Sequence, residues 1–279
     1  NSLPQVVAGN YGPVCADASE IVLNGMPAGG DWSGTGVTGN LFDPSAGTQT
    51  LTYTYTDANL CVNSDVTTIT VNPVPAVDAV TYGPVCIDAA DITLVGSPAG
   101  GVWTGNGVSG NLFDPSFGTQ TLTYTYTDAN LCTAYASATV NAISGPALSI
   151  TAQTNVLCYG NATGSATANA TGGTPPYTYS WNTSPVQIGP TANNLTAGNY
   201  IVTVIDFNLC AATAGVTITQ PAQALNAAAV AANTTCGSNN GAVNLSVGGG
   251  TMPYSYTWSN GADIEDIAGL APGTYSVTV

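Results

Sequence analysis

The side chains of this chain that could do chemistry are cysteines and carboxylates, and nothing basic accompanies them. The 279 residues include 7 Cys and 15 Asp plus Glu, but no Lys, Arg or His. Catalysis by a serine or cysteine nucleophile with a histidine base is therefore excluded, as is a lysine Schiff base. Nucleic acid is excluded as a partner, because no cation is present to neutralise a phosphate. What remains is disulfide formation, calcium binding, or hydrolysis by a pair of carboxylates.

The carboxylates offer one recurring pattern, an Asp-x-Asn triplet. The candidate calcium ligands are Asp57 with Asn59, Asp128 with Asn130, and Asp206 with Asn208. Ca²⁺ accepts such oxygens, but Asp-x-Asn also caps a tight turn without any metal, and we favour the turn. The carboxylates that could form a hydrolase pair, Glu20, Asp91 and Glu265, recur poorly between the repeats of the chain, so we predict no enzyme. We also predict no cofactor, with calcium at the Asp-x-Asn triplets as the alternative.

The first half of the chain contains one module twice. Residues 82–132 repeat residues 11–61 without a gap, and about 40 of the 51 positions are identical, which indicates copied domains. The second half repeats a different template, in which Gly172–Trp181 returns as Gly249–Trp258. We therefore predict four domains, called here the first to fourth repeats: 1–74, 75–146, 147–222 and 223–279.

The fourth repeat is predicted to be incomplete. Val279 aligns with Val204, and the third repeat continues from Val204 through Cys210 into another strand. The sequence therefore reads as part of a longer array, with the strand that would complete the fourth repeat expected beyond Val279.

The cysteines fit one disulfide per domain. The repeats suggest Cys15 with Cys61, Cys86 with Cys132, and Cys158 with Cys210, and the partner of Cys236 is expected beyond Val279. Each bridge would close a loop of about 45 to 52 residues and stabilise its domain by roughly 4 kcal/mol. Such bonds imply an oxidising compartment. The alternative is that all seven are reduced core residues; metal ligation is disfavoured because no histidine joins them and no two lie close in sequence.

Strict alternation of apolar and hydroxyl residues predicts β-strands. Residues 50–56 place Leu51 and Tyr53 on one face and threonines on the other, and residues 200–204 alternate in the same way. Short strands separated by Gly, Pro and Asp-Ala-Asn turns indicate an all-β chain of tandem immunoglobulin-like β-sandwich domains, arranged as beads on a string. Alanine-rich residues 222–232 align with residues 146–154, so we predict strand and linker there.

Each predicted domain has one tryptophan: Trp32, Trp103, Trp181 and Trp258. In this architecture a core Trp beside the disulfide is the common arrangement, so these residues are predicted core aromatics. A surface platform that stacks on sugars is the alternative. No apolar run is long enough to span a membrane.

Residues 147–279 carry the pattern Cys-x-Gly-Asn, Gly-Gly-Thr-x-Pro-Tyr-x-Tyr-x-Trp, Leu-x-x-Gly-x-Tyr-x-Val-x-Val, with Asp-x-Asn-x-Cys in the third repeat. This pattern resembles the SprB-type repeat of giant surface adhesins in gliding and other Bacteroidota. Residues 1–146 look like the Ig-like domains that accompany such repeats. The family usually has Gly after the Asn of the turn, whereas this chain has Leu60, Leu131 and Leu209. The resemblance implies a cell-surface location, export by a type IX-like route, a stalk or adhesive role, and no catalytic residues.

Two non-catalytic functions follow as hypotheses. The first is an extracellular stalk or fibre-forming segment of a repetitive adhesin. The alternative is a subunit of a polymeric filament assembled by β-strand pairing or exchange, since the chain has no lysine to guard exposed sheet edges. An array of glycan-binding modules is a lesser alternative. Self-association is the expected partner interaction, and a surface or glycan ligand would come second.

Overall fold

The computed structural model describes residues 2–236 and 238–279. The regular elements of these residues are β-strands and two short 3₁₀ helices, which confirms the predicted all-β class. The strands form several small sheets. The chain forms two compact units, Asn1–Ile143 and Ser144–Val279.

Within the described residues, no helix is long and apolar enough to cross a membrane.

The first repeat is built from short strands around one long hairpin. Its elements are β1 (Val14–Cys15), β2 (Ile21–Val22), β3 (Asp31–Ser33), β4 (Val37–Thr38), β5 (Leu41–Phe42), η1 (Pro44–Ala46), β6 (Gln49–Thr56), β7 (Val62–Ile69) and β8 (Val71–Asn72). They form the sheets β3-β6-β7 and β2-β5-β4 and the parallel pair β1-β8. On β6, Leu51 and Tyr53 are buried and Thr50 is exposed, as the alternation predicts.

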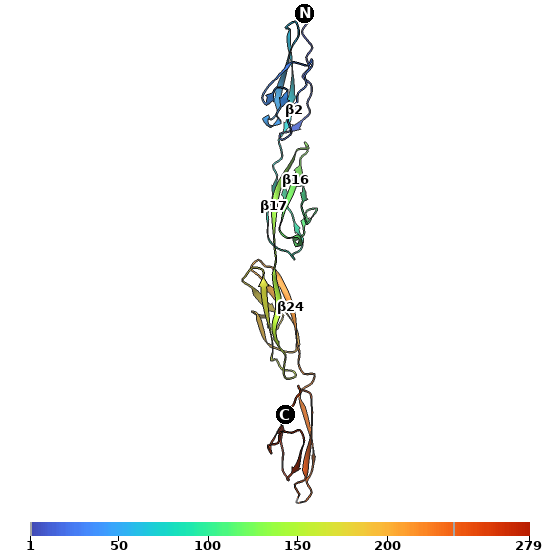
Figure 1. Cartoon of the computed structure of the whole chain (residues 1–279), viewed down its shortest axis with the longest axis vertical. Coiled ribbons are helices and arrows are strands. Elements are labelled where there is room, and N and C mark those ends of the chain that lie inside the picture. The colour runs from blue at the N-terminus through green and yellow to red at the C-terminus, as the bar shows by residue number, and fades with distance from the viewer. Residues whose placement is uncertain (1, 237) are drawn as a thin grey trace. The chain divides into compact units, whose positions relative to one another are not determined.

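The second repeat has the same plan. Its elements are β9 (Asp78–Ala79), β10 (Tyr82–Cys86), β11 (Ile92–Thr93), β12 (Gly96–Ser97), β13 (Val102–Thr104), β14 (Val108–Ser109), β15 (Leu112–Phe113), η2 (Pro115–Phe117), β16 (Gln120–Thr127) and β17 (Thr133–Ile143). The sheets are β10-β17-β16-β13, β11-β15-β14 and β12-β9. Antiparallel β16 and β17 form the long hairpin, and β10 runs parallel to β17 (Figure 1).

The third repeat consists of two facing sheets. Its strands are β18 (Pro146–Thr154), β19 (Gly164–Gly172), β20 (Thr178–Trp181), β21 (Gln187–Ile188), β22 (Thr191–Leu195), β23 (Gly198–Ile205) and β24 (Ala211–Ile218). The sheets are β18-β19-β22 and β21-β20-β23-β24. Their inner faces enclose a core that includes Trp181, Val202 and Ile218.

The fourth repeat retains less of this plan. Its strands are β25 (Asn226–Ala232), β26 (Gly241–Gly248), β27 (Thr257–Trp258), β28 (Ile267–Leu270) and β29 (Val277–Thr278). They form the sheet β25-β26-β28 and the pair β27-β29. The alanine-rich segment is the strand β25, as predicted, although a helix would suit its composition.

Within residues 2–236 and 238–279, four separate hydrophobic clusters are found, one in each repeat, and each contains or packs against its tryptophan. Trp103, Trp181 and Trp258 are buried, and Trp32 is partly buried. The division of the chain into four domains with the predicted bounds stays a proposal, because the compact units are the two given above.

A buried tyrosine organises each of the first two cores. The Tyr124 hydroxyl accepts a hydrogen bond from the Gly101 N–H at 2.7 Å and donates one to the Pro98 carbonyl. A Cβ at Gly96 or Gly101 would lie 2.5 or 2.4 Å from a Tyr124 ring atom, so only glycine lets the backbone pass this close. Tyr53 has the same partners one repeat earlier, in Gly30 and Pro27.

Candidate functional site: the Asp-x-Asn-Leu-Cys turn and its disulfide

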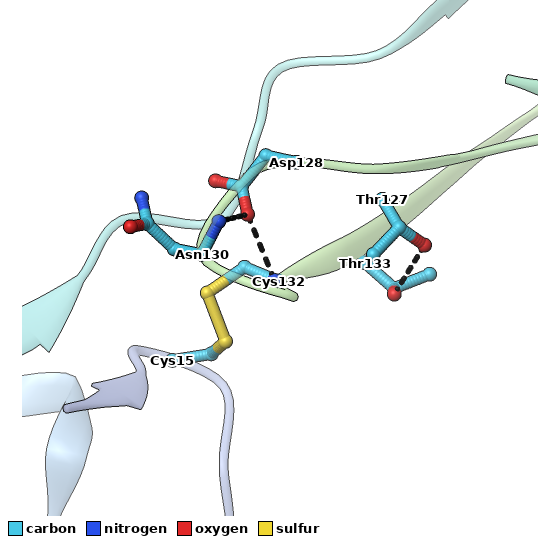
Figure 2. Close-up of a disulfide and its surroundings, with 6 residues drawn as sticks. All are labelled: Cys15, Thr127, Asp128, Asn130, Cys132 and Thr133. Atoms are coloured by element: carbon cyan, nitrogen blue, oxygen red, sulfur yellow. Dashed lines mark hydrogen bonds between the residues drawn. A yellow bond between two sulfur atoms is a disulfide. The ribbon is translucent and has the colours of Figure 1, made fainter. Parts of the chain in front are cut away.

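A disulfide joins the first repeat to the second. Its residues are Cys15 at the end of β1 and Cys132 at the end of the turn between β16 and β17 (Figure 2). Their Cα atoms are 5.5 Å apart, although the two residues are separated by 117 positions in sequence. Cys132 is buried and Cys15 is partly buried. The bond therefore links two copies of one sequence.

The Asp128 carboxylate holds the turn that presents Cys132. One carboxylate oxygen, Oδ1, accepts hydrogen bonds from the Asn130 N–H at 2.8 Å and the Cys132 N–H at 2.9 Å (Figure 2). Backbone bonds from Asp128 N to the Cys132 carbonyl, 2.9 Å, and from Leu131 N to the Asp128 carbonyl, 3.1 Å, close the loop. The hydroxyls of Thr127 and Thr133 meet at 2.8 Å where the strands enter the turn. These bonds hold the backbone of Cys132 in place within the turn.

The same turn recurs twice in the chain. Asp57 accepts from the N–H groups of Asn59 and Cys61, both at 2.8 Å. Asp206 accepts from those of Asn208 and Cys210, at 3.0 and 2.9 Å.

Asp206 makes a further bond, because its second oxygen accepts from the Thr174 N–H at 2.9 Å. Asp206 is only 3% exposed. Its bond to Thr174 connects the turn of the third repeat to the loop before β20.

The residue before each turn cysteine has an uncommon backbone conformation. Leu60, Leu131 and Leu209 have φ angles of 62°, 64° and 68°, in the left-handed region. Their side chains are 80% or more exposed, so burial does not compensate the steric cost. The turn therefore closes with leucine where the family usually has glycine, and the leucine backbone adopts the strained left-handed conformation.

The predicted pairing of Cys15 with Cys61 is wrong, and the strand register gives the reason. Cys15 lies opposite Asn72 in the β1-β8 pair, at the end of the first repeat's last strand. Cys61 immediately precedes β7, eleven residues before Asn72, which corresponds to about 35 Å of extended chain. A disulfide needs Cα atoms within about 7 Å. The two cysteines therefore lie at opposite ends of the repeat.

The other predicted pairs fail in the same way. Cys86 lies opposite Ile143, at the far end of the strand that begins directly after Cys132. Cys61, Cys158 and Cys236 are free thiols, which excludes the predicted Cys158–Cys210 bond. Cys86 and Cys210 are disulfide-bonded. The expectation of one bridge closing each domain is therefore wrong, because the Cys15–Cys132 bond runs from one repeat to the next.

The candidate calcium ligands are engaged in the turns. The Oδ1 atoms of Asp57, Asp128 and Asp206 each accept two backbone N–H bonds, the arrangement expected of a turn cap. In the part of the chain that the structure describes, no group of three or more His, Cys, Asp or Glu residues could hold a metal ion.

The tryptophans lie in the cores, away from the disulfide. The indole N–H of Trp181 donates to the Gly189 carbonyl at 3.1 Å, and that of Trp258 donates to the Ile264 carbonyl at 2.9 Å. Neither Cys15 nor Cys132 belongs to a hydrophobic cluster of the described residues. Three buried indoles present no face on which a sugar could stack.

The residues that sequence reasoning missed are the partners across the repeat boundary. Spacing shows that Cys15 opens a repeat and Cys132 closes one, but it does not show at which end of the sandwich each lies. The sequence feature that could have indicated the correct pairing is Tyr11–Cys15. This short segment can pair with the last strand of its repeat, which places Cys15 next to the following repeat.

Comparisons with known proteins agree with the sequence pattern of the second half. The family model of the SprB repeat matches residues 150–186 and 228–263, which confirms the predicted resemblance for these two segments. No curated protein sequence is significantly similar to the chain.

Solved structures of multidomain extracellular proteins show distant similarity. The eight N-terminal Ig domains of Down Syndrome Cell Adhesion Molecule match with 12% identity and a TM-score of 0.36, over 76% of this chain and 32% of that chain. A Ca²⁺-stabilized adhesin that helps an Antarctic bacterium reach out and bind ice matches with 13% identity and a TM-score of 0.30, over 98% of both chains. Extracellular domains 3–5 of Drosophila OTK match with 12% identity and a TM-score of 0.27, over 78% of this chain and 96% of that one.

Proposed function

We propose that the chain is a non-catalytic, extracellular segment of a cell-surface adhesin, a stalk whose successive repeats are joined by disulfides. The observation that carries the proposal is the Cys15–Cys132 bond, because it links two copies of one module instead of closing either copy. The SprB match supports the adhesive and cell-surface part, and the absence of Lys, Arg and His from the sequence supports the lack of catalysis.

Such a bond limits how far the chain extends under load. A force applied across the Asn1–Ile143 unit bypasses residues 16–131 as long as the bond between Cys15 and Cys132 holds. Cys15 and Cys132 are separated by 117 positions in sequence, which corresponds to about 400 Å of extended chain at roughly 3.3–3.6 Å for each residue. A stalk built in this way keeps its reach when one repeat unfolds.

Single-molecule force spectroscopy on the full chain tests the proposal. With the tethers attached at the two ends of the Asn1–Ile143 unit of the full chain, we expect the 16–131 segment to contribute nothing to the extension under oxidising conditions, and a reductant to release about 400 Å of additional contour length. Cys61→Ser is the matched control, because Cys61 occupies the same turn but carries a free thiol. Equal extension in the two redox states would refute a load-bearing role for the disulfide.

The cell-surface location and type IX-like export are part of the same proposal. They are supported by the SprB match and by disulfides that require an oxidising compartment. Antibody labelling of unpermeabilised cells checks the location; labelling that appears only after permeabilisation would contradict it.

A filament subunit is the second candidate function. It is favoured by an open groove in the fourth repeat, which is lined by Trp258, Leu270 and Val277 among others and could accept a strand from a neighbour. Electron microscopy of native material separates the candidates: regular strand exchange between subunits would favour the filament, and separate strings of domains would favour the stalk.

A further inference from the structure

The outer face of one sheet in the third repeat carries large aliphatic side chains. On β23, Val202 and Val204 are buried in the core, so the alternate residues Ile201 and Ile205 lie on the opposite face of the sheet. Ile201 is 49% exposed and Ile205 is 38% exposed. The central strand of this face therefore presents two isoleucines to solvent.

A third isoleucine lies on the same face. Ile188 of β21 is opposite Ser180 of β20, and Ser180 is in turn opposite Thr203 of β23. Residues that are opposite each other in an antiparallel pair lie on the same face of the sheet. Thr203 lies between Ile201 and Ile205 on β23, and Ile188 is 80% exposed. These three isoleucines define what we call the isoleucine face.

The other repeats have a hydroxyl residue where the third repeat has Ile201. Ile201 lies five residues before the Asp of its turn, and the residues at this distance in the first two repeats are Thr52 and Thr123. In the fourth repeat the equivalent is Ser276, because it precedes the valine that pairs with the tryptophan. A cluster of large aliphatic side chains on a solvent-facing surface is typical of an interaction site. The substitution of isoleucine for a hydroxyl residue in this repeat therefore indicates a contact surface.

The third repeat is also almost free of charge. Residues 147–222 contain one carboxylate, that of Asp206, and no Glu, Lys, Arg or His. Asp206 is buried and accepts hydrogen bonds within its turn and from Thr174. The other 14 of the 15 Asp and Glu residues belong to the first, second and fourth repeats. The isoleucine face therefore lies on an uncharged surface of a chain whose net charge is −15.

This charge distribution indicates what the isoleucine face binds. A cationic partner would be attracted to the carboxylates of the other three repeats and not to the third. A second copy of this chain, which also carries −15, is repelled by those repeats, but no like charges oppose each other where two third repeats meet. Depletion of charged residues at the centre of a contact is typical of protein–protein interfaces. A second copy is therefore the partner that the uncharged surface fits.

We propose that the isoleucine face of the third repeat binds the isoleucine face of a second copy of this chain, in a symmetric contact between two sheets. In such a contact each copy contributes the same surface, so every residue of the face is buried twice. Two sheets pack face to face about 10 Å apart, with their side chains interdigitating. The inference goes beyond the proposed function, because a stalk needs no second copy.

Sedimentation equilibrium of the intact chain tests the proposal. The free thiols of Cys61, Cys158 and Cys236 are first alkylated with iodoacetamide, so that no new disulfide can join two copies. We expect a concentration-dependent equilibrium between monomer and dimer. A chain that remains monomeric at every protein and salt concentration would overturn the proposal.

Added salt should favour the dimer. The carboxylates of the other repeats repel those of the second copy, and this repulsion is screened as the Debye length falls from about 30 Å in 0.01 M salt to about 3 Å in 1 M salt. The dissociation constant of the dimer should therefore fall as NaCl is added. A dimer that dissociates on addition of NaCl would overturn the proposal, because its contact would be ionic.

Ile201→Thr tests the face itself and introduces the residue that the first two repeats have at this position. It should raise the dissociation constant of the dimer about tenfold or more, because the symmetric contact loses buried aliphatic surface from both copies. Val66→Thr is the matched control, since Val66 is a 59% exposed aliphatic residue on β7 of the first repeat. It should leave the dissociation constant unchanged. Equal effects of the two substitutions would overturn the proposal.

Crosslinking locates the contact without depending on a weakened variant. Thr203→Cys places a thiol in the middle of the isoleucine face, and Thr54→Cys places one at the equivalent position of the first repeat. In chains whose three free cysteines are replaced by Ser, a bismaleimide should join two copies of the Thr203→Cys chain and leave the Thr54→Cys chain monomeric. Equal crosslinking of the two would overturn the proposal. A monomeric chain that sediments with phosphatidylcholine vesicles would also overturn it, and would assign the face to a lipid surface.

Discussion

Cys61 and Cys132 occupy the same position of the same turn, yet Cys132 is bonded to Cys15 and Cys61 carries a free thiol. Both backbone N–H groups donate to the carboxylate four residues earlier, at 2.8 and 2.9 Å. The difference between the two cysteines therefore lies in what faces the turn and not in the turn itself. This makes them a matched pair for experiments.

Replacing Cys15 by Ser should destabilise the Asn1–Ile143 unit, whereas Cys61→Ser should leave its stability unchanged. The disulfide closes a loop of 117 residues, for which chain entropy gives a loss of about 5 kcal/mol. Denaturant unfolding under oxidising conditions measures both variants, and Cys132→Ser should reproduce the Cys15→Ser result. Equal stability of the two serine variants would contradict the assignment of the bond.

Asp128→Ala should weaken the turn that holds Cys132. The substitution removes the acceptor of two N–H bonds, at a cost of about 1–3 kcal/mol for the groups left unpaired. Asp128→Asn keeps an acceptor oxygen and should lose less. Thermal unfolding measures both, and equal losses for Asn and Ala would show that negative charge, rather than hydrogen bonding, matters at this position.

Leu131→Asn should stabilise the second repeat. Leu131 has a φ of 64° and is 80% exposed, so asparagine relieves left-handed strain with little loss of buried surface. The expected gain is up to about 1 kcal/mol. Leu3→Asn is the control, since Leu3 is exposed without a positive φ. A loss of stability on Leu131→Asn would mean that the leucine makes a contact that offsets its strain.

Tyr124→Phe should cost about 1–3 kcal/mol, because the Gly101 N–H and the Pro98 carbonyl lose their partner in a buried setting. Tyr135→Phe serves as the control, since that ring is 76% exposed. Chemical denaturation compares the two variants. Similar losses from both would show that the buried hydroxyl contributes nothing specific.

Chelation of divalent cations should leave the melting temperature unchanged. The Oδ1 atoms of Asp57, Asp128 and Asp206 already accept two backbone N–H bonds each, so the turns close without a cation. Calorimetry with EDTA and with added Ca²⁺ checks this. A Ca²⁺-dependent rise that is lost on Asp128→Asn would revive the calcium hypothesis.

The strands could be predicted because burial in a sheet imposes a two-residue period on the sequence. The alternation around Leu51 and Tyr53 predicts β6, and the repeat alignment predicts β25 against the helical propensity of its alanines. In both cases each residue's environment is set within its own repeat. The information therefore lies within a short stretch of sequence.

The disulfide connectivity could not be predicted, because it depends on where each cysteine lies along the sandwich. Cys15 is carried to the end of the first repeat by its parallel pairing beside Val71 and Asn72, a non-local contact between two very short strands. No periodicity marks such a pair. The apparent symmetry of one cysteine near each end of every repeat favoured closure within the repeat, which the register rules out.

The Cys15–Cys132 bond has a consequence for survival outside the cell. Any single cut of the backbone between residues 16 and 131 leaves both pieces attached through sulfur. This unit therefore separates into two pieces only if a protease cuts it outside that span or a reductant breaks the bond. With no lysine or arginine, the sequence also gives trypsin-like proteases no site. The chain thus tolerates nicking without losing its continuity.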